Sequence, residues 1–188
     1  GLSWATAKKT VSAGLSTAQS GDEIWVTAGT YTPTSGTDRT IALQLKSGVG
    51  LYGGFAGTET LRTQRDSNVN ITTLSGDLSG NDGSNFSNNA ENSYHVVTGS
   101  GTDASAVLDG FAIVGGNANG STAATQKGGG LYLSGGQATV THCTFRQNYA
   151  VSGGGLALDA ASTLTNCRFV GNAATNGGAV YANGSTAT

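Results

Sequence analysis

This chain is poor in charge, proline and sulfur, and it has no long apolar run. Charged residues make up 11% of its 188 positions, and it contains one Pro, two Cys and no Met. The few basic residues are not clustered and the formal net charge is -2, which argues against a nucleic-acid partner. No apolar stretch is long enough to span a bilayer, so we expect no membrane insertion of this segment. The 31 Gly, with much Ser, Thr and Asn, are typical of surface and secreted β-proteins.

A repeat of about 24 residues organises the last part of the chain. Thr141 to Asn148 and Thr165 to Asn172 share the pattern Thr-x-Cys-x-Phe-x-x-Asn, and their cysteines lie 24 positions apart (167 minus 143). Gly pairs followed by alternating apolar residues recur from Gly128, Gly153 and Gly177. A fixed period of this length indicates a repeat architecture, in which one unit buries its apolar face only by stacking on the next.

The residue types within the repeat favour strands. Leucine-rich repeats share the period, but they need a regular Leu pattern and usually a helical arm, whereas these units are built from Gly, Thr, Asn, Ala and Val. Alternations such as Leu131 and Leu133 suit short strands with one face inward, and Gly and Asn suit the corners. Three such strands per turn, connected in the right-handed sense, predict an all-β fold, a right-handed parallel β-helix.

In that fold, equivalent positions of successive turns lie about 4.8 Å apart. The sequence therefore predicts an interior structural ladder in which each residue of one turn stacks on its equivalent in the next. An Asn at a corner can bond the turns above and below through its amide. The predicted pairs are Cys143 with Cys167, Phe145 with Phe169, and Asn148 with Asn172.

Two motifs resemble known β-helical proteins. Phe145 to Asn148, Phe169 to Asn172 and Gly177 to Val180 resemble the Phe-x-x-Asn and Gly-Gly-Ala-[Ile/Leu/Val] repeats of the polymorphic outer membrane proteins, a family of autotransported bacterial adhesins with β-helical passengers. This resemblance covers the last third of the chain and implies a location outside the cell or at the bacterial surface. Gly21 to Tyr31 resembles the first turn of many pectate-lyase-like β-helix proteins and carries no catalytic residue.

Residues 1–20 are expected to form an N-terminal cap, and residues 21–188 the β-helix. Residues 3–19 read as one helix with Ser3 as N-cap and Gly21 as its end. Its apolar residues fall three and four positions apart: Trp4, Ala7, Val11, Leu15 and Ala18. Such a helix covers the open sheet edge and the exposed core of the first turn. About 24 residues per turn after the cap predict roughly seven turns, or a rod of about 34 Å.

The stretch from Tyr52 to Asp66 is predicted to be a long excursion, after which Val69, Ile71 and Leu74 resume the coil. The excursion concentrates charge: Glu59, Arg62, Arg65 and Asp66. These residues suit either a carbohydrate or partner contact, with Arg forks for carboxylated sugars, or an ion-paired loop packed against the outside of the coil. We favour the ion-paired loop.

The segment from Ser75 to Asn89 is rich in Asp, Asn and Gly. Asp77, Asn81 and Asp82 offer oxygen ligands for calcium, the one cofactor that this sequence suggests. Their spacing does not match an EF-hand or the nonapeptide repeat of calcium-binding rolls. We therefore favour an ordinary polar loop without a metal, and expect no cofactor.

Cys143 and Cys167 share a ladder position, so a disulfide is conceivable in an oxidising compartment. Cysteine is also readily buried as a small hydrophobic residue, and we favour two stacked thiols. A zinc site is disfavoured because there is no third Cys, and His95 and His142 lie far apart in the sequence.

No catalytic residue is identified. Polygalacturonase-like enzymes have this type of fold but cluster Asp residues on neighbouring turns, whereas here the 11 acidic residues are scattered and the regular turns contain only Asp159. Arg146 follows Phe145 while Arg168 precedes Phe169, so the two arginines are predicted to occupy different rows.

Three functions remain open. The favoured one is a non-catalytic extracellular β-helix segment of a bacterial surface or secreted protein, adhesin-like or a structural spacer, with carbohydrate or protein ligands. The second is a polysaccharide lyase or hydrolase, which requires acids from separate turns to meet on one face. The third is an extracellular fibre subunit that associates end to end, because the last turn has no cap and an open strand edge can pair with another. With no signal peptide, we expect a mature form or an excised piece that continues beyond residue 188 or stacks on another molecule.

Overall fold

The computed structural model describes residues 1–183, which form short strands in four open parallel sheets. The first sheet contains β1 (Glu23–Thr27), β4 (Gly50–Phe55), β7 (Val107–Asp109), β11 (Thr139–Thr141) and β15 (Thr163–Thr165). The second contains β2 (Gly29–Tyr31), β5 (Thr72–Ser75), β8 (Ala112–Val114), β12 (Thr144–Arg146) and β16 (Arg168–Val170).

The third sheet contains β3 (Leu43–Gln44), β6 (Val97–Thr98), β10 (Leu131–Leu133), β14 (Leu156–Leu158) and β18 (Val180–Ala182). The fourth contains β9 (Asn117–Ala118), β13 (Tyr149–Ser152) and β17 (Ala173–Asn176). The helical elements are α1 (Val11–Thr17) and four single 3₁₀ turns: η1 (Trp4–Thr6), η2 (Arg62–Gln64), η3 (Ser84–Phe86) and η4 (Ala124–Gln126). None of the described helices is long and apolar enough to cross a membrane.

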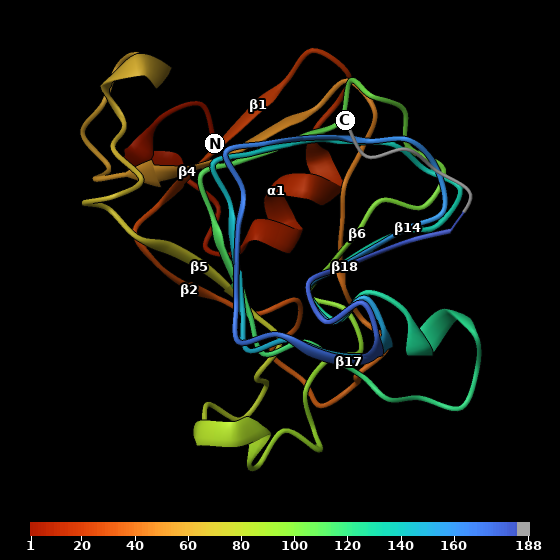
Figure 1. Ribbon diagram of the computed structural model, residues 1–188. Coiled ribbons are helices and arrows are strands. Elements are labelled where there is room, and N and C mark those ends of the chain that lie inside the picture. The colour runs from red at the N-terminus through yellow and green to blue at the C-terminus, as the bar shows by residue number, and fades with distance from the viewer. Residues whose placement is uncertain (184–188) are drawn as a thin grey trace.

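Each strand pairs in parallel with the strand one turn later, so the chain follows the same path repeatedly (Figure 1). This confirms an all-β arrangement of stacked parallel sheets, as in a solenoid. The regular turns run through β11, β12, β13 and β14, which is four strands per turn instead of the predicted three. The difference arises because residues around the ladder Asn extend far enough to pair with their equivalents, as Tyr149 does with Ala173.

The prediction of roughly seven turns was wrong for the described residues, because the first sheet has five strands. Only the last turns keep the 24-residue spacing, as from Thr139 to its partner Thr163. The second turn is far longer: Gly50 pairs with Val107, 57 positions later (107 minus 50). At about 4.8 Å per strand, five strands extend over about 19 Å.

The interior is a set of apolar stacks, one for each of three sheets. In the second sheet Leu74, Ile113 and Phe145 occupy the same row, and each is fully buried. Equivalent rows in the first and third sheets join Leu51 to Leu108 and Leu131 to Leu156. Burial of these rows against the next turn is the main favourable contribution to folding.

The repeated Gly pairs let adjacent turns approach closely. A Cβ atom on Gly130 would lie 2.5 Å from the carbonyl oxygen of Gly155 on the next turn, closer than real Cβ atoms come to any neighbour. Any larger residue would therefore force the turns apart, which explains the Gly at this point of the repeat.

The N-terminal helix is shorter than predicted. The expected helix over residues 3–19 is divided into η1 and α1, and the N-cap of α1 is Thr10, whose hydroxyl accepts a hydrogen bond from the Ala13 amide at 3.2 Å. Ser3 makes no such bond, and α1 ends at Thr17, before Gly21. Trp4 does not join the helix face, because its ring packs against Phe55 at 5.6 Å and Trp25 at 6.2 Å.

The excursion begins and ends later than predicted. β4 continues to Phe55, whose ring stacks on Trp25, and β5 starts only at Thr72. Val69 and Ile71 were expected to be in the coil, but they are exposed by 74% and 50%, and Leu74 alone of that group is buried.

Candidate functional site

The predicted ladder residues lie inside the coil. Phe145 and Phe169 are directly in register, and their rings stack with centroids 4.9 Å apart. Cys143 is buried and both cysteines are free thiols; burial raises the pKa of each thiol, which disfavours the reactive thiolate. These four side chains are packing residues.

Asn148 and Asn172 link three turns at one corner. Asn148 is fully buried; its Nδ2 donates to Ile113 O at 2.9 Å and to Asn172 Oδ1 at 3.0 Å, and its Oδ1 accepts from the Gly116 amide at 2.9 Å. Asn172 Nδ2 donates to Phe145 O at 2.9 Å. The pair satisfies backbone groups at a bend and offers nothing to a ligand.

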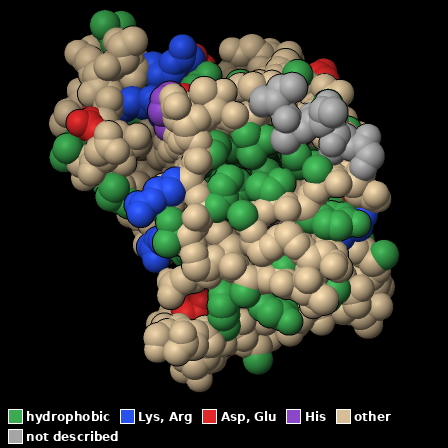
Figure 2. Space-filling view, viewed as in Figure 1, with side chains coloured by type: hydrophobic (Ala, Val, Ile, Leu, Met, Phe, Trp, Pro, Cys, Tyr) green, Lys and Arg blue, Asp and Glu red, His purple; other side chains and the backbone are tan. Residues whose placement is uncertain are grey.

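One outer surface is better placed for binding. Two loops leave the coil on either side of the second sheet: residues 56–71, between β4 and β5, and residues 76–91, between β5 and β6. We call these the first loop and the acidic loop, and the sheet surface between them the framed face. Figure 1 shows the two loops projecting in gold and in yellow-green, and Figure 2 shows the outline hollowed between the two lobes.

The first loop is tied to the coil by ion pairs. Arg62 pairs with Glu23 and lies over the ring of Tyr52, 4.6 Å from its centroid. Glu59 accepts hydrogen bonds from the amides of Ala56 at 2.6 Å and Gly57 at 3.0 Å, and these bonds lower its pKa although partial desolvation opposes them. The prediction of ion pairs is confirmed for Arg62 and Arg65, whereas Glu59 and Asp66 accept hydrogen bonds from backbone amides of the loop itself.

At the corner between the first and second sheets, polar side chains from several turns meet. Arg65 pairs with Asp109 at 2.5 Å, and its other nitrogen donates to Gly53 O at 2.9 Å. His142 Nδ1 lies 3.3 Å from Asp109 Oδ1, and His142 Nε2 lies 3.1 Å from Asn166 Nδ2. We call Arg65, Asp109, His142 and Asn166 the corner cluster.

The corner cluster combines a buried acid with an accessible imidazole. The Asp109 side chain is 12% exposed and that of His142 is 53% exposed. His142 has a positive φ of 49°, like Asn166 (54°) and Gly110 (83°) at the equivalent turn positions. A His in this conformation is uncommon, and it aims the ring along the outside of the corner.

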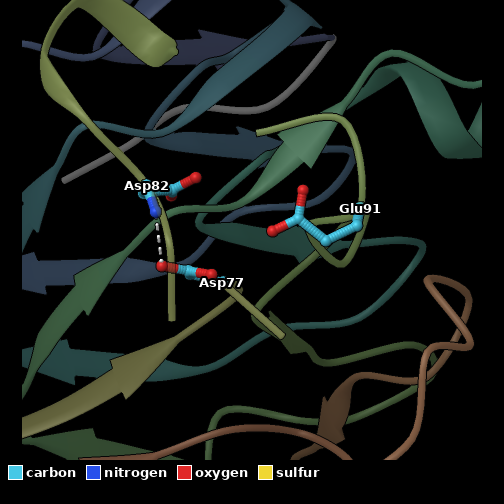
Figure 3. Close-up of side chains that lie close together, drawn as sticks. All are labelled: Asp77, Asp82 and Glu91. Carbon is cyan, nitrogen blue, oxygen red and sulfur yellow. Dashed lines mark hydrogen bonds between the residues drawn. The ribbon is translucent and has the colours of Figure 1, made fainter. Parts of the chain in front are cut away.

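In the acidic loop, Asp77, Asp82 and Glu91 hold carboxylate oxygens within 4.8 Å of one another (Figure 3). Asp77 already accepts hydrogen bonds from four backbone amides, including Gly80 N at 2.6 Å and Asp82 N at 3.0 Å. Asn81, the third residue of the predicted calcium set, is exposed, and its backbone amide donates to Asp77 Oδ1 at 3.2 Å. The bonds to Asp77 favour the interpretation as a polar loop ordered by its own backbone.

Asp82 has an unusual environment. Partial burial raises its pKa to about 6, and the charges of Asp77 and Glu91 add to this, whereas the hydrogen bond from Asn92 Nδ2 at 2.7 Å opposes it. Asp82 also lines a pocket of about 330 Å³ at the edge of the framed face, next to Val114 and Gln147.

Two rows of side chains point outward from the framed face. One row joins Thr30, Thr73, Ala112, Thr144 and Arg168, and the other joins Val114, Arg146 and Val170 and begins at Ser75, which is buried. The prediction that Arg146 and Arg168 occupy different rows is confirmed. The surface is therefore a strip of small, hydroxyl and apolar side chains with two arginines.

A larger hollow, of about 1080 Å³, lies at the first turn between the N-terminal segment, β1 and the first loop. Trp4 and Trp25 line it, but both indole nitrogens are already engaged, with Glu59 O at 2.9 Å and Glu23 Oε2 at 2.8 Å. It contains no cluster comparable to those beside the framed face.

No family model matches this chain, and neither a curated protein nor a solved structure matches it significantly.

The corner cluster was not predicted from the sequence. His142 and Asn166 lie one 24-residue repeat apart, so their proximity was open to prediction. The contact between Arg65 and Asp109 was not open to prediction, because the two residues belong to turns of irregular length. They meet only because Tyr52 pairs with Asp109.

Proposed function

We propose that the four parallel sheets are the faces of a right-handed parallel β-helix, and that this chain is a non-catalytic extracellular segment of a bacterial surface or secreted protein. Every strand pairing is parallel, and the right-handed sense is strongly preferred for parallel connections. The framed face is the ligand-binding surface of this adhesin-like segment, and its ligand is an extended carbohydrate or a protein surface.

The observation that carries this proposal is the framed face itself. It is a strip of outward side chains bounded by two anchored loops, and it includes Thr30, Thr73 and Thr144, which can bond sugar hydroxyls. Three nearby carboxylates are already occupied: Asp109 by Arg65, Glu23 by Arg62, and Asp77 by backbone amides. These three groups therefore suit a structural role better than acid catalysis.

A blocking substitution tests this function. Thr144 is half-buried on the framed face, so Thr144→Trp should obstruct that surface and abolish binding to a panel of glycans and host surface proteins, measured by surface plasmon resonance. Thr163→Trp, which adds the same bulk on the outer surface of the first sheet, is the control and should bind normally. Equal binding by both variants would remove the framed face from consideration.

The corner cluster supports a second candidate, a polysaccharide-degrading enzyme. An acid, an imidazole and a guanidinium from separate turns meet there, and an imidazole or a carboxyl group can act as a general acid or base. If this candidate is right, the chain turns over uronic-acid polymers, and Asp109→Asn abolishes turnover but leaves binding intact. Binding without product formation would leave the adhesin-like function.

A further inference from the structure

Two arginines on the framed face have no acidic partner. Of the five arginines, Arg39 donates to Asn92 O at 2.6 Å, and Arg62 and Arg65 form ion pairs. Within residues 1–183, neither Arg146 nor Arg168 lies within ion-pair distance of a carboxylate. Among the described residues, the only side-chain hydrogen bond of either is the one that Arg146 donates to the neighbouring Gln147 Oε1 at 3.4 Å.

These two side chains stand on adjacent turns of the same surface. Arg168 is in register with Thr144, and Arg146 with Val170, so the two lie diagonally across one pair of strands. From the strand spacing and rise, their Cα atoms are about 8 Å apart. Both are exposed, and Figure 2 shows blue Lys and Arg side chains at the edge of the molecule between the two lobes.

Unpaired guanidinium groups on an extended face favour an anionic ligand. A guanidinium binds a carboxylate or sulfate with two parallel hydrogen bonds, and the binding is stronger when no internal acid competes. Thr144 lies beside Arg168 and can donate to sugar hydroxyls. The carboxylates of Asp77, Asp82 and Glu91 lie in the acidic loop, at one edge of the framed face, and repel an anionic ligand there. The ligand is therefore expected over β12 and β16.

We propose that the framed face binds an anionic polysaccharide, bearing carboxylate or sulfate groups, through Arg146 and Arg168. This inference rests on the proposed function and names the ligand class for the same surface. A single-stranded nucleic acid fits less well, because the two outward rows described above carry no aromatic side chain on which bases could stack.

The test compares the double variant Arg146→Gln and Arg168→Gln with Lys8→Gln and Lys9→Gln. The lysine pair is exposed in the N-terminal segment and forms no ion pair within the described chain, so both double variants change the net charge equally. The probes are polygalacturonate (carboxylate), dextran sulfate (sulfate), unmodified dextran (neutral) and single-stranded DNA, each immobilised for surface plasmon resonance. Circular dichroism and the melting temperature of each variant confirm that the fold is kept.

We expect the wild type to bind one of the two anionic polysaccharides more tightly than dextran, with affinity that falls as salt rises. Each arginine substitution should weaken binding about tenfold, and the pair about a hundredfold, because each removes a charge-assisted contact. The lysine variant should bind like the wild type. The preferred probe shows whether carboxylate or sulfate is recognised.

Equal binding by the arginine variant and the wild type would overturn the proposal, as would tighter binding to DNA than to either anionic polysaccharide. A third outcome is that dextran binds, that the arginine substitutions do not change this binding, and that Thr144→Trp abolishes it. That outcome would overturn the anionic ligand alone and leave the framed face as a carbohydrate site. If Thr144→Trp bound every probe as tightly as the wild type does, both proposals would be contradicted.

Discussion

At the scale of single residues, the buried asparagine is the most constrained side chain of the repeat. Asn148 bonds backbone groups of two neighbouring segments, Ile113 and Gly116, and none of these groups has access to water. Its amide supplies both a donor and an acceptor, which no apolar residue of similar size can do. The Asn of the repeat is thus explained by the backbone that it satisfies.

We therefore expect Asn148→Ala to lower the free energy of unfolding by about 3 kcal/mol, because it leaves a buried carbonyl and a buried amide unpaired. The measurement is urea denaturation followed by circular dichroism. Asn68→Ala is the matched control, since Asn68 is exposed in the first loop and its side chain makes no hydrogen bond within the described chain. Equal loss of stability in the two variants would contradict this role.

The raised pKa of Asp82 predicts that stability depends on pH. Its pKa is raised from the ordinary value of 3.8 to about 6, so the folded state holds this proton more tightly than the unfolded state does. The contribution of Asp82 to stability is then present below about pH 4 and is lost as the pH rises through 6.

Asp82→Asn removes the ionisation but keeps an oxygen that can accept from Asn92 Nδ2. We expect the variant to gain stability relative to the wild type, and to gain more at pH 7 than at pH 4, as measured by urea midpoints at both values. A difference between variant and wild type that does not depend on pH would show that Asp82 is not perturbed.

At the scale of strands and loops, each strand is too short to be stable by itself and depends on its neighbours in the stack. β12 has partners on both sides, β8 and β16, whereas β16 pairs with β12 alone among the described strands. Phe145 is accordingly fully buried and Phe169 only partly so, although the two residues occupy the same place in the repeat.

This difference predicts unequal costs for the same substitution. Phe145→Ala should lower the free energy of unfolding by about 3–5 kcal/mol, because it leaves a cavity within a stack. Phe169→Ala should cost clearly less, since part of its ring remains in contact with water. Val170→Ala, at a position that is 41% exposed, serves as the surface control in the same urea series. Equal effects at the two Phe positions would contradict the stacking argument.

At the scale of the whole molecule, the described chain is a one-dimensional stack in which each strand pairs only with strands of adjacent turns. Its stability should be a sum of turns and of the interfaces between them. In the 188-residue chain the strands β15, β16, β17 and β18 each pair with a described strand on one side only.

Hydrogen exchange followed by mass spectrometry tests this picture. Amides of β15 to β18 should exchange faster than those of β11 to β14, because opening the last turn breaks one interface and opening the preceding turn breaks two. Uniform protection across both turns would mean that the whole stack opens as one cooperative unit.

The 24-residue period by itself determined the regular part of the fold. Any chain with Phe145 and Phe169, or Asn148 and Asn172, one turn apart in a parallel stack must place them next to each other, and the structure does so. The different rows of Arg146 and Arg168 followed from the same arithmetic. Local spacing is enough here because paired residues of these last turns lie 24 or 25 positions apart.

In the turns that differ in length, only the tertiary structure decided which residues meet. The pairing of Gly50 with Val107 fixes how much chain leaves the coil, and thereby brings Arg65 to Asp109 and places the two loops beside the second sheet. The single helix predicted over residues 3–19 is not formed, and Trp4 packs on Phe55 and Trp25 instead of on a helix face. Repeats specify contacts between equivalent residues, whereas contacts between unlike segments depend on loop length and packing, which the period does not encode.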